Sequence, residues 1–117
     1  MRVVTQDAFG GPEQLHVAER PIPQPGEGEM LVRVSAAGIN PVDLAVRAGA
    51  LPLIGDPPFI LGWDIAGTVE KTGSGVTDFA PGVRVMGLSR FPREAGAYGE
   101  YACVSAAEFV RTPENMT

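Results

Sequence analysis

The polar residues whose types and spacing could support chemistry lie in the segment from Gly38 to Gly49. Asn40 carries an amide with one acceptor oxygen and two donor hydrogens, and Asp43 follows three positions later. Asn40 is also a favourable N-cap, Pro41 suits the first helical position, and Gly49 is a natural helix stop. A short helix is therefore predicted here, with Asn40 and Asp43 at its start. Asp43 has two interpretations, a residue that complements the helix dipole or a general acid.

Metal and nucleophile chemistry is restricted by the residue counts. The chain has one cysteine, Cys103, and one histidine, His16. A zinc site built on Cys and His needs three or four such ligands, so no metal site is expected, and a single cysteine forms no internal disulfide. A Ser-His-Asp triad would have to use His16, for which we expect an exposed position on a strand.

Composition and charge exclude further classes of function. The formal net charge is −5 and the basic residues are scattered, which argues against binding to nucleic acid. No apolar run approaches the roughly 20 residues of a membrane helix, and the first seven residues lack the pattern of a signal peptide. We therefore expect a cytoplasmic protein that binds no membrane. Its 117 residues, 44% of them hydrophobic, suit one folded domain.

The remaining chain is predicted to be mostly β. Glycine and proline punctuate it throughout, as is typical of short strands separated by turns. One or two short helices and a small barrel are expected. The turn at 73–75 has two glycines, but no third glycine and no helix follow, so a Rossmann-type nucleotide site is not expected. The expected strands span residues 2–8, 15–19, 30–36, 65–72, 83–88, 98–104 and 109–111.

Three segments, 36–43, 61–70 and 80–85, together resemble the N-terminal half of the medium-chain dehydrogenase/reductase superfamily, in its zinc-independent NADPH:quinone oxidoreductase branch. The resemblance implies one GroES-like, partly open β-barrel over residues 1–117, an α+β fold, with the Rossmann cofactor domain absent from this chain. Zinc-dependent relatives carry a ligand cysteine where this chain has Asn40. They carry a ligand histidine and a glutamate where it has Trp63 and Asp64.

The same resemblance implies roles for individual residues. Asn40 and Asp43 would be catalytic, Asn40 and Trp63 would contact the cofactor, and Leu51, Trp63 and Tyr98 would line the substrate pocket. Each has a simpler interpretation as well: Asn40 as a helix cap, Trp63 as a core residue, Tyr98 as an ordinary strand aromatic. Asp64 is expected only to cap or to bond backbone.

The function implied by the resemblance is hydride transfer from NADPH to a small carbonyl, enone or quinone, without zinc, by a homodimer. This chain would supply the substrate-side wall and would be inactive without the Rossmann domain. The alternative is a stand-alone GroES-like binding or co-chaperone module with no enzymatic activity. The apolar loop at 50–59 would be a lid, a surface covered by the second domain, or the contact to a partner.

Overall fold

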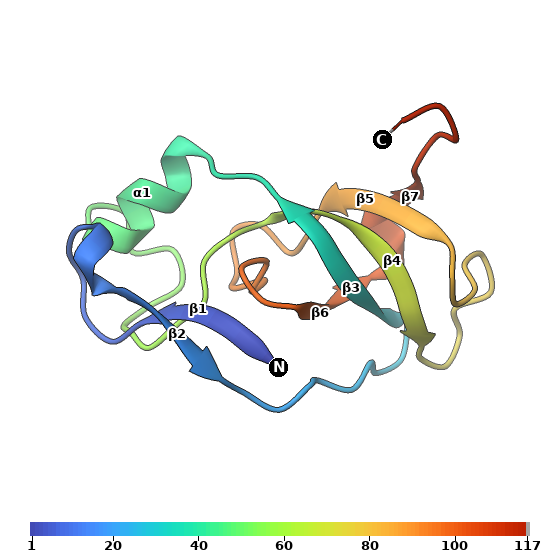
Figure 1. Ribbon diagram of the computed structural model, residues 1–117, viewed down its shortest axis with the longest axis horizontal. Helices are drawn as coiled ribbons and strands as arrows, with labels where there is room; N and C mark the ends of the chain where they lie inside the picture. Colours follow the sequence, from blue (N-terminus) through green and yellow to red (C-terminus); the bar gives the residue numbers. More distant parts are fainter. Residues whose placement is uncertain (117) are drawn as a thin grey trace.

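The computed structural model describes residues 1–116, which form seven strands, one α-helix and two 3₁₀ turns (Figure 1). This confirms the predicted number of strands, and the one α-helix agrees with the expectation of one or two short helices. The expected strand at 98–104 begins later, at Tyr101, because the preceding residues bond to other loops and to β1. The elements are β1 (Arg2–Gln6), η1 (Pro12–Gln14), β2 (Leu15–Glu19), β3 (Glu29–Ala37), α1 (Pro41–Ala48), β4 (Asp64–Thr72), β5 (Arg84–Leu88), β6 (Tyr101–Ser105), η2 (Ala106–Glu108) and β7 (Phe109–Arg111).

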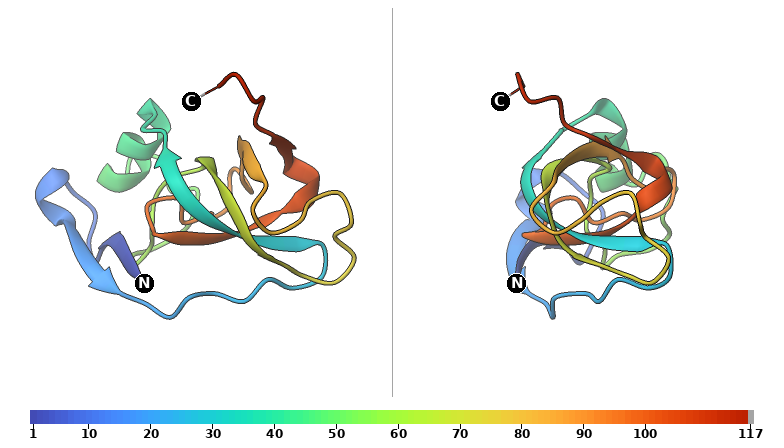
Figure 2. Two further views of the ribbon diagram at one scale, coloured as in Figure 1. Left: turned by 45° about the vertical axis from the view of Figure 1, so that its right-hand side comes forward. Right: turned by 90° about the vertical axis from the view of Figure 1, so that its right-hand side faces the viewer.

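The strands form two antiparallel sheets. β1 pairs with β2, and the larger sheet has the order β6-β3-β4-β5-β7. β6 and β7 are its two edges, so within residues 1–116 the strands do not close into a barrel (Figure 2). Isolated hydrogen bonds attach the small sheet to the rest of the domain. One of them is donated by the Val4 N–H to the Tyr98 carbonyl at 2.8 Å. The arrangement is the expected β-rich, partly open GroES-like fold.

Two hydrophobic clusters form the core. The first lies on the five-stranded sheet and includes Met30, Val32, Val85 and Val104, each fully buried. The second lies beneath α1 and joins Val46, Phe59, Leu61 and Trp63. Burial of such side chains is the main favourable contribution to folding.

The apolar loop at 50–59 packs mainly against its own domain. Leu53 and Ile54 lie half-buried on the second cluster, and Phe59 is part of it. Most of the large apolar side chains of this loop therefore make their contacts within the domain itself. Leu51 remains 40% exposed.

Helix α1 has the predicted boundaries. Asn40 is its N-cap, Pro41 its first residue, and Gly49 ends it in the left-handed conformation with φ of 87°. Phe9 packs against Gly49, where an added Cβ would lie 2.9 Å from its ring. The helix is the longest in residues 1–116, and no helix there has the length and hydrophobicity to cross a bilayer.

Candidate functional site

The side chain and main chain of Asn40 are held by two aspartates. Its Nδ2 donates a hydrogen bond of 2.6 Å to Asp64 Oδ2, and its backbone N–H donates one of 2.9 Å to Asp43 Oδ2. The second contact belongs to a capping box, in which the Asn40 side chain also faces the backbone N–H of Asp43. One hydrogen of Nδ2 therefore has no hydrogen-bond partner in residues 1–116.

Asp64 reaches Asn40 because β3 and β4 run side by side. It is the first residue of β4, and its carbonyl accepts a bond of 3.2 Å from the Gly38 N–H just beyond β3. Its carboxylate packs against Gly38, where a Cβ would lie 2.8 Å from Oδ2. Glycine at position 38 thus makes room for the carboxylate that bonds Asn40.

Asp43 is 2% exposed, and its second oxygen, Oδ1, has no hydrogen-bond partner within the described residues. The Tyr98 hydroxyl lies close by and donates a long bond of 3.4 Å to the Gly38 carbonyl. Burial, and then the negative charges of Asp43 and Asp64, hold the pKa of Tyr98 well above its ordinary value. At neutral pH the Tyr98 hydroxyl is therefore a donor and not a phenolate.

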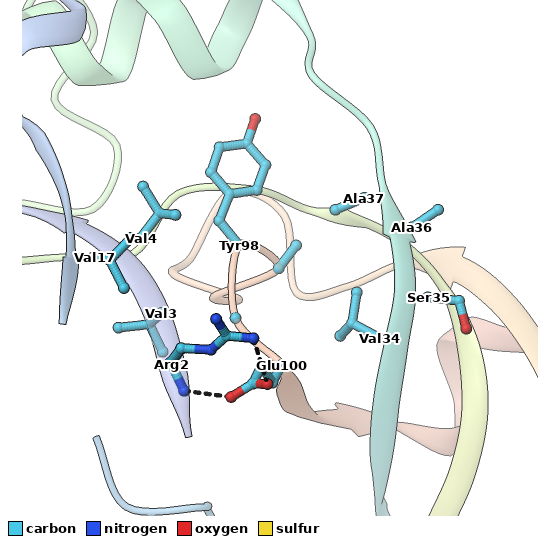
Figure 3. Close-up of a pocket in the computed structure, with 12 residues that line it drawn as sticks. Arg2, Val3, Val4, Val17, Val34, Ser35, Ala36, Ala37, Tyr98 and Glu100 are labelled. Carbon is cyan, nitrogen blue, oxygen red and sulfur yellow. Dashed lines mark hydrogen bonds and ion pairs between the residues drawn. The ribbon is translucent and has the colours of Figure 1, made fainter. Parts of the chain in front are cut away.

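Three hollows surround this group. The largest, of about 490 Å³, lies beside Asp64 and the end of β3. A second, of about 390 Å³, lies between β1 and β3 and is lined largely by valines and alanines (Figure 3). A third, of about 120 Å³, lies against α1. Tyr98 borders the second and third hollows, and Figure 3 shows its hydroxyl pointing toward α1.

Trp63 lies in the core, which agrees with the simpler of its two interpretations. Its side chain is 1% exposed, and its Nε1 donates a bond of 2.6 Å to the Arg93 carbonyl. The ring of Phe91 packs edge-on against it, with centroids 5.2 Å apart. Its only donor is used and its faces are covered, so we do not retain it in the candidate site.

The structure brings together three of the predicted site residues, namely Asn40, Asp43 and Tyr98. Leu51 follows the opposite end of α1, where its N–H bonds to the Ala45 carbonyl. Asp64 was not predicted to touch Asn40, because the two residues are 24 positions apart and no local spacing relates them. The only signal was the acidic residue at the corresponding position of the resembling family.

Other potential reactive groups lie elsewhere. His16 is exposed on β2, as predicted, with Nε2 3.6 Å from a carboxylate oxygen of Asp7. The Cys103 thiol is half-buried, and this burial raises its pKa. In residues 1–116 no three His, Cys, Asp or Glu side chains come close enough together to hold a metal ion.

Comparison with known proteins places the chain in a family. The model of the alcohol dehydrogenase GroES-like domain matches residues 26–114. The chain belongs to this family. The quinone oxidoreductase of Lama guanicoe is 35% identical over 117 residues, covering 99% of this chain and 34% of the relative. The Mus musculus protein named synaptic vesicle membrane protein VAT-1 homolog-like is 32% identical over 117 residues. This match covers 100% of this chain and 27% of the mouse protein.

A solved structure agrees with the sequence comparison. The crystal structure of Escherichia coli quinone oxidoreductase complexed with NADPH superposes on this chain with a TM-score of 0.91 at 32% identity. The superposition covers 100% of this chain and 35% of the E. coli enzyme chain. The chain thus spans about a third of the length of these relatives. The resemblance to the medium-chain dehydrogenase/reductase superfamily, in its N-terminal GroES-like domain, is confirmed.

Proposed function

We propose that this chain forms the substrate-side wall of an NADP(H)-dependent oxidoreductase that reduces a carbonyl, enone or quinone by hydride transfer. The observation that carries the proposal is the Asn40 amide, fixed by Asp64 with one hydrogen left unpaired. A fixed donor of this kind stabilises the negative charge that develops on a carbonyl oxygen as hydride reaches the carbon. The relatives named quinone oxidoreductases, one of them in complex with NADPH, support the same reaction class.

We propose that the cofactor contacts this chain only at its reactive end. The turn at 73–75 is followed by another turn and then β5, so it lacks the helix that would bind a pyrophosphate. We propose that the pyrophosphate is held by a Rossmann domain outside residues 1–117. The free Nδ2 hydrogen of Asn40 would then contact the nicotinamide carboxamide or the substrate oxygen. The nicotinamide supplies the hydride when bound, while this chain orients the acceptor.

In this proposal the amide of Asn40 takes the place that a Lewis-acid metal has in other carbonyl reductions, so zinc is not required. The protonated Tyr98 hydroxyl and the alanines at the end of β3 shape the adjoining wall. On the family resemblance we also propose a cytoplasmic homodimer. The alternative, a binding module that acts through the loop at 50–59, has less support because Leu53 and Ile54 are packed on the core.

The test compares the chain alone with a chimera. Residues 1–116 replace the matching segment of the E. coli enzyme, and NADPH oxidation is followed by absorbance with a quinone and with an enone. We expect turnover in the chimera and none from the chain alone. Asn40→Ala in the chimera should lower kcat by about 10²-fold, the usual effect of losing one such donor.

Besides an inactive chimera, three results would contradict the proposal. One is an Asn40→Ala chimera as active as its parent. The second is micromolar binding of NADPH to the chain alone by calorimetry, because it would place the whole cofactor site here. The third is a discrete ring of subunits in light scattering after size-exclusion chromatography, which would favour the binding module.

A further inference from the structure

We propose that Asp64 is a positioning residue, which determines the direction in which the Asn40 amide presents its free hydrogen. This inference rests on the proposed function for its catalytic consequence, but not for its structural part. The bond from Asn40 Nδ2 to Asp64 Oδ2 is 2.6 Å long and partly buried. A bond of this length to a carboxylate is charge-assisted, and such bonds are roughly twice as strong as neutral ones.

The contacts of Asn40 admit one orientation of its amide. Nδ2 faces the carboxylate of Asp64, while the side chain also faces the backbone N–H of Asp43. If the amide were turned over, its oxygen would face a carboxylate and its NH₂ group would face an N–H, so both contacts would become repulsive. The carboxylate at position 64 therefore determines that an N–H, and not a C=O, is left for a ligand.

Asp64 is itself held from two sides. The Asp64 carbonyl accepts a hydrogen bond of 3.2 Å from the Gly38 N–H, and on its other side Asp64 lies opposite Leu88 of β5 in the sheet. Its carboxylate lies against the bare Cα of Gly38. None of the ion pairs formed by residues 1–116 includes Asp64, so the amide of Asn40 is the partner that the structure provides for its charge.

Two effects of the Asp64 charge oppose each other in the reaction. Holding the amide favours catalysis, because a donor pre-set toward the developing charge needs no reorganisation. A nearby negative charge by itself disfavours a developing oxyanion. The sign of the effect of Asp64→Asn on kcat therefore decides between a positioning role and a merely electrostatic one.

The structural test uses the full chain labelled with ¹⁵N. The side-chain signals of Asn40 are assigned by their loss in Asn40→Asp. We expect one Nδ2 proton to be shifted downfield and protected from exchange with water, and both features to be lost in Asp64→Asn. Asp56→Asn, at an exposed aspartate of the 50–59 loop, is the matched control and should leave the signals unchanged. Signals unaffected by Asp64→Asn would overturn the inference.

The functional test uses the chimera described above. Asp64→Asn should lower kcat by roughly tenfold to hundredfold, as expected for a misplaced catalytic group, with KM for NADPH changed less than about twofold. An unchanged or increased kcat would overturn the inference. If the unsubstituted chimera is inactive, the proposed function fails, and the amide signals of the chain alone still decide whether Asp64 orients Asn40. If the Asp64→Asn variant does not fold, the Asp64→Ser variant, whose side chain is smaller, replaces it in both tests.

Discussion

Replacing Gly38 by alanine tests the contact between the two strands that build the site. The added Cβ would lie 2.8 Å from Asp64 Oδ2 and 3.1 Å from Asp64 Cβ. Gly38 is not among the residues with positive φ, so its backbone accepts alanine without strain. Any cost of Gly38→Ala must therefore come from the contact with Asp64.

The size of this cost follows from the distances. Ordinary contact begins at 3.4 Å, so the Asp64 oxygen must retreat by about 0.6 Å from its position at 2.8 Å. A retreat directed away from Asn40 lengthens their bond of 2.6 Å to about 3.2 Å, the long limit for a hydrogen bond. Losing most of a hydrogen bond to a charged group costs about 1.5 to 3 kcal/mol. Alanine also makes the unfolded chain stiffer, which offsets about 0.4 to 1 kcal/mol of this loss and leaves a net loss of about 0.5 to 2.6 kcal/mol.

Urea unfolding followed by the fluorescence of Trp63, the single tryptophan, measures this loss. The matched experiment repeats Gly38→Ala in an Asp64→Ala background. The oxygen is then absent and only the 3.1 Å contact with Cβ remains, so the same substitution should cost less than half as much. A stabilising Gly38→Ala, or an equal cost in both backgrounds, would refute the reasoning.

Three further outcomes are expected. Gly49→Ala should lower the free energy of unfolding by about 2 kcal/mol, measured in urea, because its φ of 87° is left-handed and Phe9 blocks the new Cβ. Trp63→Phe should cost about 1 to 3 kcal/mol by thermal unfolding, since it leaves the Arg93 carbonyl without its donor. Because the pKa of Tyr98 is raised, the folded state keeps the phenol proton up to a higher pH than the unfolded state does. The stability of the folded state therefore falls as the pH rises above ~10, because the unfolded state then loses the Tyr98 proton first. Tyr98→Phe removes this titration and should flatten the alkaline decline in the free energy of unfolding.

The local features of this fold could be predicted from the sequence because local rules produce them. Asn40, Pro41 and Gly49 give α1 its boundaries through capping, a fixed φ and a left-handed stop. The strands follow from apolar residues between glycine and proline. By contrast, Tyr98 precedes its strand because its N–H bonds the Leu61 carbonyl and its carbonyl bonds Val4. Such contacts between distant loops have no signature in local composition.

The candidate site was predicted only in part for the same reason. Asn40 and Asp43 lie three positions apart, so the helix signals placed both at the start of α1, although the capping box between them was not predicted. Asp64 joins them through the β3–β4 pairing, whose register shifts twice, between Leu31 and Val32 and between Val34 and Ala36. No sequence pattern here indicates those shifts, and each one changes which residues face each other.

The atoms that hold the Asn40 amide and the exposed apolar side chains along α1 and at its two ends belong to different residues. Ile39 is 76% exposed, Leu44 46% and Leu51 40%, and none of them contributes a side-chain hydrogen bond to the site. Substitutions at exposed positions usually change stability by less than about 0.5 kcal/mol. A combinatorial library at these three positions would therefore vary the shape and polarity offered to an acceptor molecule while the hydrogen-bonding centre stays in place. In the proposed enzyme, these positions would therefore suit directed evolution of substrate choice.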